Sequence, residues 1–159
     1  MSGVRAEIDE IIDCTVEQAF ERAIDLSHYS DWMPRNGVFK KSIQTSDGPV
    51  GLGTEFVDQG RMGTFRGDVV EFHRPSRVVF NETLRWFGRP VVEARLQYEF
   101  RAVPRGTALH HVAGSELHGL LRLMRPIVAV IGGGERQRTV RALKRSLESD
   151  NTGATAPAA

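Results

Sequence analysis

The 159-residue chain lacks several features that would indicate a particular class of protein. It has a single cysteine, Cys14, which excludes an intrachain disulfide and any metal site built from several cysteines. It contains no run of 18 apolar residues, so we expect no membrane-spanning helix. Its opening residues, MSGVRAEIDE, lack the apolar segment of a secretory signal. These absences together predict a cytoplasmic protein.

The chain also lacks the large net charge that is typical of nucleic-acid-binding proteins. Its 21 basic and 20 acidic side chains give +1 at pH 7, so we expect no nucleic-acid partner. The charge is uneven, because residues 119–149 carry seven basic and two acidic side chains. A solvated helix face is the ordinary explanation of such a segment, and transient contact with an anionic lipid surface or RNA is the alternative.

What the chain does contain is enough apolar sequence for one packed domain. Hydrophobic residues make up 40% of the chain and charged residues 26%, which is typical of a globular domain of this length. We expect this domain to span residues 1–149. The small, polar residues 150–159 are expected to form a disordered tail. Either a monomer or a homodimer is compatible with the sequence.

Hydrophobic periodicity predicts a strand, two short helices, six further strands and a long C-terminal helix. Residues 3–13 alternate as a strand does, and Thr15 and Gln18 have the spacing of a capping box at the start of a helix. A second short helix fits residues 26–33. Turn signals divide residues 37–116 into six strands joined as hairpins, which predicts an antiparallel sheet with one buried face.

The alternation also predicts which polar side chains face inward. It is clearest in residues 91–103, where it places Tyr98 on the buried face. The neighbouring strands place His111 and Glu82 on the same face. The phase of residues 63–73 stays open, because the apolar side chains of this strand fall on both faces.

The expected C-terminal helix has an apolar stripe that includes Gly133 and Arg136. Three consecutive glycines, residues 132–134, interrupt this stripe, and each costs about 1 kcal/mol relative to alanine inside a helix. We expect them to bend or loosen the helix. Tolerance of glycine in a long helix is one explanation, and room for a ligand beside Gly133 is the other.

The order of these elements and several short motifs resemble a known superfamily. The motifs are DLSHYSDWMP at 25–34, GPVGLGT at 48–54, VVEFHRPSRVVF at 69–80, a strand opening with Gly106-Thr107, and a last helix ending ALKRSLES. In this order they resemble the helix-grip superfamily of START lipid-transfer domains and polyketide cyclase/dehydrase-like proteins (SRPBCC). The resemblance covers residues 3–149 and is closest to the polyketide cyclase-like branch.

The resemblance implies an α+β helix-grip fold. In this fold a curved, seven-stranded antiparallel sheet wraps around the long C-terminal helix, and a deep, mostly apolar cavity lies between them. Members bind sterols, lipids, quinones, polyketides or hormones, and some catalyse cyclisation or dehydration. The resemblance therefore implies a pocket without implying a particular reaction. We expect no cofactor.

The side chains expected to line this cavity suit a flat, hydrophobic ligand such as a lipid, a polyketide or another polycyclic aromatic compound. They are Trp32, Met33, Phe56, Phe65, Trp86, Phe100, Gly133 and Arg136. Asp58 shares a face with Phe56 but is interpreted as an ordinary charge at an edge or turn.

Three inward side chains, those of His111, Glu82 and Tyr98, are candidate catalytic residues, and Arg136 is an alternative hydrogen-bond donor. His111 or Glu82 would act as the base, and Tyr98 or Arg136 as the hydrogen-bond donor to a developing oxyanion. The plainer alternatives are a hydrogen-bonded core histidine, a capped tyrosine hydroxyl, and a register error that leaves Glu82 and Arg136 in solvent. No HExxH motif and no histidine pair at i, i+4 is present, so we expect no metal site.

Three functions are compatible with these observations. The preferred hypothesis is binding of a small hydrophobic ligand in the cavity, because no catalytic motif is recognisable. The second is a polyketide cyclase or dehydratase that uses general acid–base chemistry there. The third is an interaction protein that uses the basic C-terminal helix.

Overall fold

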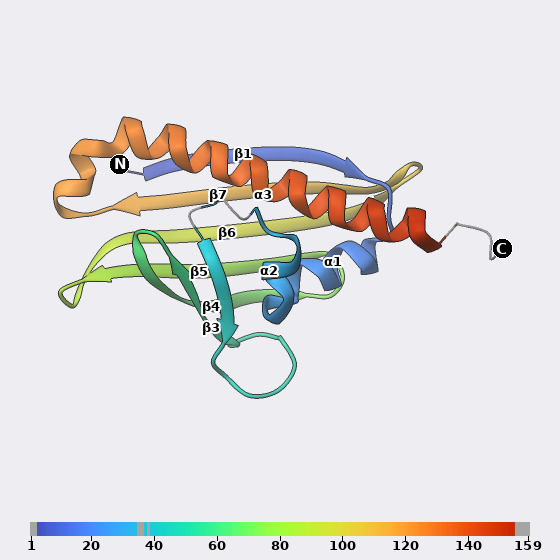
Figure 1. The fold of residues 1–159 in the computed structure, drawn as a ribbon, viewed down its shortest axis with the longest axis horizontal. Helices are drawn as coiled ribbons and strands as arrows, with labels where there is room; N and C mark the ends of the chain where they lie inside the picture. The colour runs from blue at the N-terminus through green and yellow to red at the C-terminus, as the bar shows by residue number, and fades with distance from the viewer. Residues whose placement is uncertain (1–2, 35–36, 38, 155–159) are drawn as a thin grey trace.

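The structure is a computed structural model that describes residues 3–34, 37 and 39–154, and it consists of one sheet with a long helix along it (Figure 1). Its elements are β1 (Gly3–Ile12), α1 (Val16–Ile24), the 3-10 helix η1 (Leu26–His28), α2 (Tyr29–Trp32), β2 (Phe39–Gln44), β3 (Glu55–Gly60), β4 (Gly63–His73), β5 (Arg77–Trp86), β6 (Arg89–Val103), β7 (Gly106–Leu117), the 3-10 helix η2 (Gly119–Met124) and α3 (Arg125–Ala154). This confirms the expected α+β helix-grip fold.

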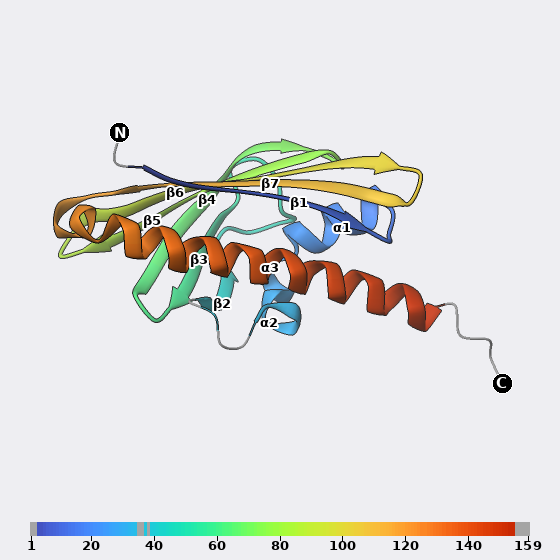
Figure 2. The same ribbon diagram turned by 90° about the horizontal axis from the view of Figure 1, so that it is seen from above.

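The seven strands form one antiparallel sheet in the order β1-β7-β6-β5-β4-β3-β2. Strands β2 to β7 follow one another as hairpins, and β1 pairs with β7. Helix α3 crosses the inner face of this sheet, as Figures 1 and 2 show from two sides. The space between the helix and the sheet is therefore where a ligand site can form.

The first helix begins as its sequence predicts. The backbone N–H of Gln18 donates to Thr15 Oγ1 over 3.2 Å, and the backbone N–H of Thr15 donates to Gln18 Oε1 over 3.0 Å. This capping box satisfies two backbone donors that would otherwise lack partners. The buried side of α1, which includes Phe20, then packs into the core.

The inward phase of β4, which the sequence leaves open, is determined by a bulge. The pairing with β5 shifts between Val69 and Glu71, so one extra residue lies in β4 at this point. The shift allows Phe65 and Val69 before the bulge, and Phe72 after it, to contact the core. Strict alternation cannot place all three on one face.

Helix α3 runs unbroken for 30 residues through the glycines at 132–134. Pro126 lies in its first turn, where the missing N–H of proline costs no hydrogen bond. The glycines therefore do not end the helix, and the expectation that they bend or loosen it stays a prediction. The expected start of the tail is wrong, since residues 150–154 are helical, and residues 155–159 lie outside the described residues.

The buried side chains form two groups. The larger surrounds α1 and the C-terminal half of α3, with Val140 and Leu143 at its centre. The smaller, which includes Leu84 and Leu117, lies beneath η2. Within the described part of the chain, no helix is both long enough and apolar enough to cross a bilayer.

Candidate functional site

A cavity of about 230 Å³ lies between the inner face of the sheet and the N-terminal half of α3. Strands β1 and β4 to β7 form its floor, and η2 and α3 form its roof. Nearly all of its lining is apolar, with side chains such as Phe65, Leu96 and Ile127. The polar side chains along it are Glu82, Ser115, Glu135 and Arg136. This placement agrees with the cavity that the resemblance implies.

The glycines of α3 contribute to the space in this cavity. Gly132 and Gly133 both line it, and a Cβ added to either would meet no other atom of the described structure within 4 Å. A larger side chain at Gly133 would therefore enter the space that is now open. The geometry is compatible with the prediction that Gly133 leaves room for a ligand.

A second, much smaller space of about 20 Å³ continues from the first towards α2. It is lined by Met33, Phe56, Asp58 and Tyr98, among others. The two spaces share three wall residues, Glu82, Leu96 and Arg136. The site is thus an apolar chamber whose inner end carries a concentrated group of polar side chains.

A pair of buried carboxyl groups forms the centre of this polar end. Glu82 on β5 is 5% exposed and Asp58 on β3 is 6% exposed, and the two carboxyls hydrogen-bond to each other. One oxygen of each, Glu82 Oε2 and Asp58 Oδ1, has no hydrogen-bond partner among the described residues. Buried polar atoms in this state are costly and commonly mark a place where another molecule binds.

Burial and the neighbouring Asp58 carboxyl set the protonation of Glu82. Burial, with Asp58 as the second cause, raises the pKa of Glu82 to about 8, and burial also raises the pKa of Asp58. The nearby Arg136 guanidinium opposes both shifts. Glu82 therefore holds its proton at neutral pH and can donate a hydrogen bond.

Arg136 on α3 places a positive charge near the two carboxyl groups. It is half-buried, lines both spaces and hydrogen-bonds to the Tyr98 hydroxyl. Burial raises the pKa of Tyr98, and Arg136 lowers it in part. Glu82 and Arg136 thus face the interior from opposite layers, and the alternative in which both are in solvent does not hold.

His111 is fully buried in β7 beside these groups but does not reach the chamber. Its Nδ1 lies 2.9 Å from the carbonyl oxygen of Gln97, which can only accept, so Nδ1 carries the proton. Its ring packs against Tyr98 with centroids 4.2 Å apart, and Nε2 has no partner among the described residues. Burial and Arg136 lower the pKa of His111 to about 3, which makes it a weak base.

The predicted lining residues are divided between the site and the rest of the core. Met33 and Phe56 border the small space, and Phe65 and Gly133 border the large one. The structure does not bring three aromatic side chains to either space, and their role in binding stays a prediction. Trp32 packs on Tyr29 at 5.2 Å, Phe100 packs on Phe20 at 6.0 Å, and Trp86 is 41% exposed at the end of β5.

Asp58 is the site residue that sequence reasoning missed. Gly67 on β4 lies directly opposite Phe56 on one side and Glu82 on the other. A Cβ at Gly67 would lie 2.4 Å from the Phe56 ring, so only glycine allows this ring to lie across β4. An isolated glycine within a strand is a known sign of such a close approach, and it could have pointed to β3 and β5 as neighbours of one site.

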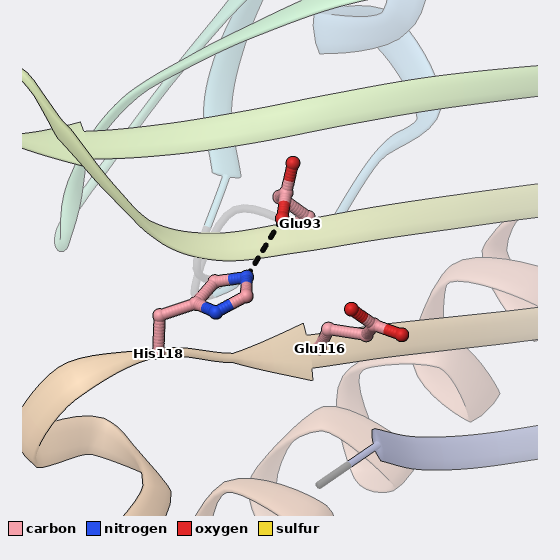
Figure 3. A group of neighbouring side chains, drawn as sticks. All are labelled: Glu93, Glu116 and His118. Atoms are coloured by element: carbon pink, nitrogen blue, oxygen red, sulfur yellow. Dashed lines mark hydrogen bonds and ion pairs between the residues drawn. The ribbon is translucent and has the colours of Figure 1, made fainter. Parts of the chain in front are cut away.

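A separate cluster of potential metal ligands lies on the outer face of the sheet. Figure 3 shows Glu93 on β6 with Glu116 and His118 on and after β7, and their ligand atoms all lie within 4.8 Å of one another. Histidine motifs with short spacing do not indicate this arrangement, because its residues come from two neighbouring strands. The His118 ring already pairs with Glu93 at 2.7 Å, and both glutamates are exposed. An ion pair at the surface accounts for the cluster.

Comparisons with known proteins were made for sequence and for structure. Residues 3–148 match the profile of a family described as polyketide cyclase / dehydrase and lipid transport. No curated protein matches the chain.

Solved structures with the same fold include two di-domain ARO/CYC proteins. StfQ, from the steffimycin biosynthetic pathway, has a TM-score of 0.73 and 12% identity over 95% of this chain and 52% of its own. BexL, from the BE-7585A biosynthetic pathway, has a TM-score of 0.71 and 13% identity over 92% of this chain and 50% of its own. The chain thus spans about half the length of these two proteins.

A third solved structure matches over its whole length. Protein BH1534 from Bacillus halodurans has a TM-score of 0.68 and 14% identity over 93% of this chain and 100% of its own. At these identities the similarity extends to the fold alone.

Proposed function

Because the chain belongs to the polyketide cyclase / dehydrase and lipid transport family, we propose that it binds a small, mainly apolar molecule that carries an oxygen acceptor at one end. The molecule would be a lipid, a polyketide or another aromatic compound. The observation that carries the proposal is the apolar chamber whose inner end holds a protonated Glu82 beside Arg136. Burial of the apolar part of the ligand would make the free energy of binding more favourable by about 25 cal/mol for each Å² of its surface removed from water.

The polar end of the chamber indicates the chemistry of the ligand. Arg136 donates hydrogen bonds, and Glu82 in its acid form can turn its single O–H from Asp58 to a ligand, so the two fit a carbonyl, carboxylate or enolate oxygen. The volume of about 230 Å³ lies below the roughly 300–1,000 Å³ of sites that hold drug-sized ligands. A ligand of one or two rings, or a short acyl chain, therefore fits best.

The test fills the chamber without disturbing the sheet. Gly133→Leu places a side chain in the open space, whereas Gly134→Leu, at an exposed helix position, is the matched control. Binding of the probe 2-naphthoate, a fluorescent two-ring carboxylate, is measured by titration, beside native mass spectrometry of the purified protein for a carried ligand. We expect Gly133→Leu to weaken probe binding at least tenfold and Gly134→Leu to leave it unchanged. Equal binding by the two variants would contradict the proposal.

A second candidate function, a cyclase or dehydratase, is favoured by the pKa of Glu82. A carboxyl with a pKa of about 8 can exchange a proton near neutral pH, as general acid–base catalysis requires. In an aldol closure the ionised form of Glu82 would take the proton from the α-carbon, while Arg136 and Tyr98 hydrogen-bond to the enolate oxygen that forms. After the enolate carbon attacks the second carbonyl, Glu82 as the acid would return this proton to the new alkoxide. His111, with a pKa of about 3 and no position in the chamber wall, is a poorer base than the sequence suggests.

The enzyme hypothesis has its own test. With a poly-β-ketone substrate, Glu82→Gln should lower kcat by at least 100-fold with little change in KM, because the amide preserves shape but cannot transfer the proton. Turnover of this variant at the wild-type rate would exclude Glu82 as the base and acid. It would leave the binding proposal untouched, since that is measured with the probe.

A further inference from the structure

Exposed apolar side chains gather at the end of the molecule where the cavity opens. Phe87, Leu120, Leu123 and Val130 are each at least 77% exposed. They lie on the turn between β5 and β6, on η2 and on the first turns of α3, which Figures 1 and 2 both place at the same end. We refer to residues 60–66, 85–91 and 118–131 together as the apolar end.

Direct contacts join the three segments of the apolar end. The indole N–H of Trp86 donates to the carbonyl oxygen of Met62 over 3.3 Å, and the backbone N–H of His118 donates to Val91 over 2.9 Å. Met62 and Ile127 line the same cavity. The apolar end is therefore one continuous surface around the cavity mouth.

The helical part of this surface is apolar on more than one side. Leu121 and Val128 face the core. Leu120 and Leu123, three residues apart on η2, and Val130 on α3 are exposed to solvent. A helix with apolar residues on both sides is normally covered by another layer. Phe87 adds a fully exposed aromatic ring, held outward at a turn position with φ of 51°.

The charge of the apolar end indicates what covers it. Its three segments contain six arginines and no aspartate or glutamate. Arg61, Arg85, Arg89 and Arg122 are among them, and all four are exposed. A second copy of the chain would bring the same arginines face to face across a two-fold axis, which is unfavourable. A surface that is both apolar and anionic, such as a bilayer with acidic headgroups, is complementary to it.

We propose that the apolar end docks on an anionic lipid bilayer, with Phe87, Leu120 and Leu123 in the interfacial layer and the arginines at the phosphates. This surface shares only residues 119–131 with the basic segment 119–149 that the sequence suggests as a contact, and it adds the β3–β4 and β5–β6 turns. This proposal does not depend on which ligand the cavity binds. If the proposed function holds, docking also places the cavity mouth at the membrane, so that an apolar ligand need not cross water.

Vesicle flotation tests the apolar contribution. The full-length protein is mixed with phosphatidylcholine vesicles, and with vesicles that also contain phosphatidylglycerol, at low and high salt. We expect binding to the anionic vesicles that weakens as salt is raised. Phe87→Ser and the double variant Leu120→Ser/Leu123→Ser should each reduce it at least tenfold. Leu52→Ser, at a 72% exposed site between β2 and β3, is the matched control and should bind as wild type.

Arginine variants test the electrostatic contribution. Arg122→Gln should lower binding about fivefold, the effect of one cation near an anionic surface. Arg105→Gln, in the exposed β6–β7 turn at the opposite end, should not change it. The proposal is overturned if no anionic vesicle binds at low salt, or if Leu52→Ser loses as much binding as Phe87→Ser. A dimer in analytical ultracentrifugation that Leu120→Ser/Leu123→Ser dissociates would also overturn it, in favour of self-association.

The failure of docking can be separated from the failure of ligand binding. The same serine variants are titrated with 2-naphthoate in the absence of vesicles. Their chamber is unaltered, and Gly133→Leu is the negative reference. Loss of vesicle binding with retained probe binding supports docking through this surface. Loss of both in the serine variants indicates a disturbed chamber and contradicts the assignment of these side chains to the membrane alone.

Discussion

In the C-terminal half of α3, Val140, Leu143 and Leu147 are at most 4% exposed and pack in the main core. In the N-terminal half, Gly132 and Gly133 leave a cavity of about 230 Å³ above the same sheet. The helix is continuous and the sheet is shared, so the difference comes from what fills the space beside each half. Helix α1 and large buried side chains pack against the C-terminal half, whereas glycines border open space in the N-terminal half. One half of the helix stabilises the fold, and the other half leaves room for a ligand.

Truncating one apolar side chain in each half should reveal this division most strongly. Leu143→Ala removes a side chain that is 1% exposed, and we expect a loss of about 2–5 kcal/mol in the free energy of unfolding. Ile131→Ala, at a 55% exposed position beside the cavity, should cost less than about 1 kcal/mol. Urea denaturation measures both. Similar losses at the two sites would mean that the cavity half also supports the fold.

The free energy of unfolding should depend on pH because of Glu82, which borders both the cavity and the small space next to it. Glu82 has a folded pKa of about 8 against an ordinary value of 4.5, so the unfolded chain loses this proton first as pH rises. The free energy of unfolding should therefore fall between pH 4.5 and 8, by at most about 1.4 kcal/mol per pH unit. Glu82→Gln should flatten this slope, whereas Glu55→Gln, at an exposed position on β3, should not. Parallel slopes for all three proteins in urea titrations would exclude a buried neutral Glu82.

The smallest effect is expected at the glycines themselves. Gly134→Ala lies at an exposed position inside α3, where a Cβ meets no other atom of the described structure within 4 Å. It should stabilise the protein by about 1 kcal/mol and leave probe binding unchanged. Thermal denaturation with probe titration checks both. A loss of stability would show that the helix needs its glycines for a reason other than open space.

Most of the fold follows from local sequence signals. The capping box at Thr15 and Gln18, the turn signals, and the alternation around Tyr98 each depend on residues close together in the chain. The inward phase of β4 does not, because the bulge after Val69 is a property of its pairing with β5. The length of α3 was underestimated for a related reason, since its last turns contact residues such as Asp13 near the start of the chain.

The candidate site was predictable only in part. Glu82, Tyr98 and Arg136 were found because each breaks an apolar pattern in its own element. Asp58 was missed because its partner Glu82 lies two strands away, and only the sheet register brings the two carboxyls together. The part of the interior that each aromatic ring fills was not predictable, since alternation shows that a ring such as Phe100 faces inward but not whether it borders the cavity or the main core.

The order of strands has a consequence for how the chain folds. Strand β1 is the first to be synthesised, yet its partner β7 is the last, with Gly3 opposite Glu116. Such distant pairing slows folding, because a long loop must close before any contact forms. Until then both edges of β1 are open, and the charged side chains Arg5, Glu7 and Asp9 along it discourage association with other chains. A chain that stops before residue 106 leaves β1 without the strand that holds it in the sheet.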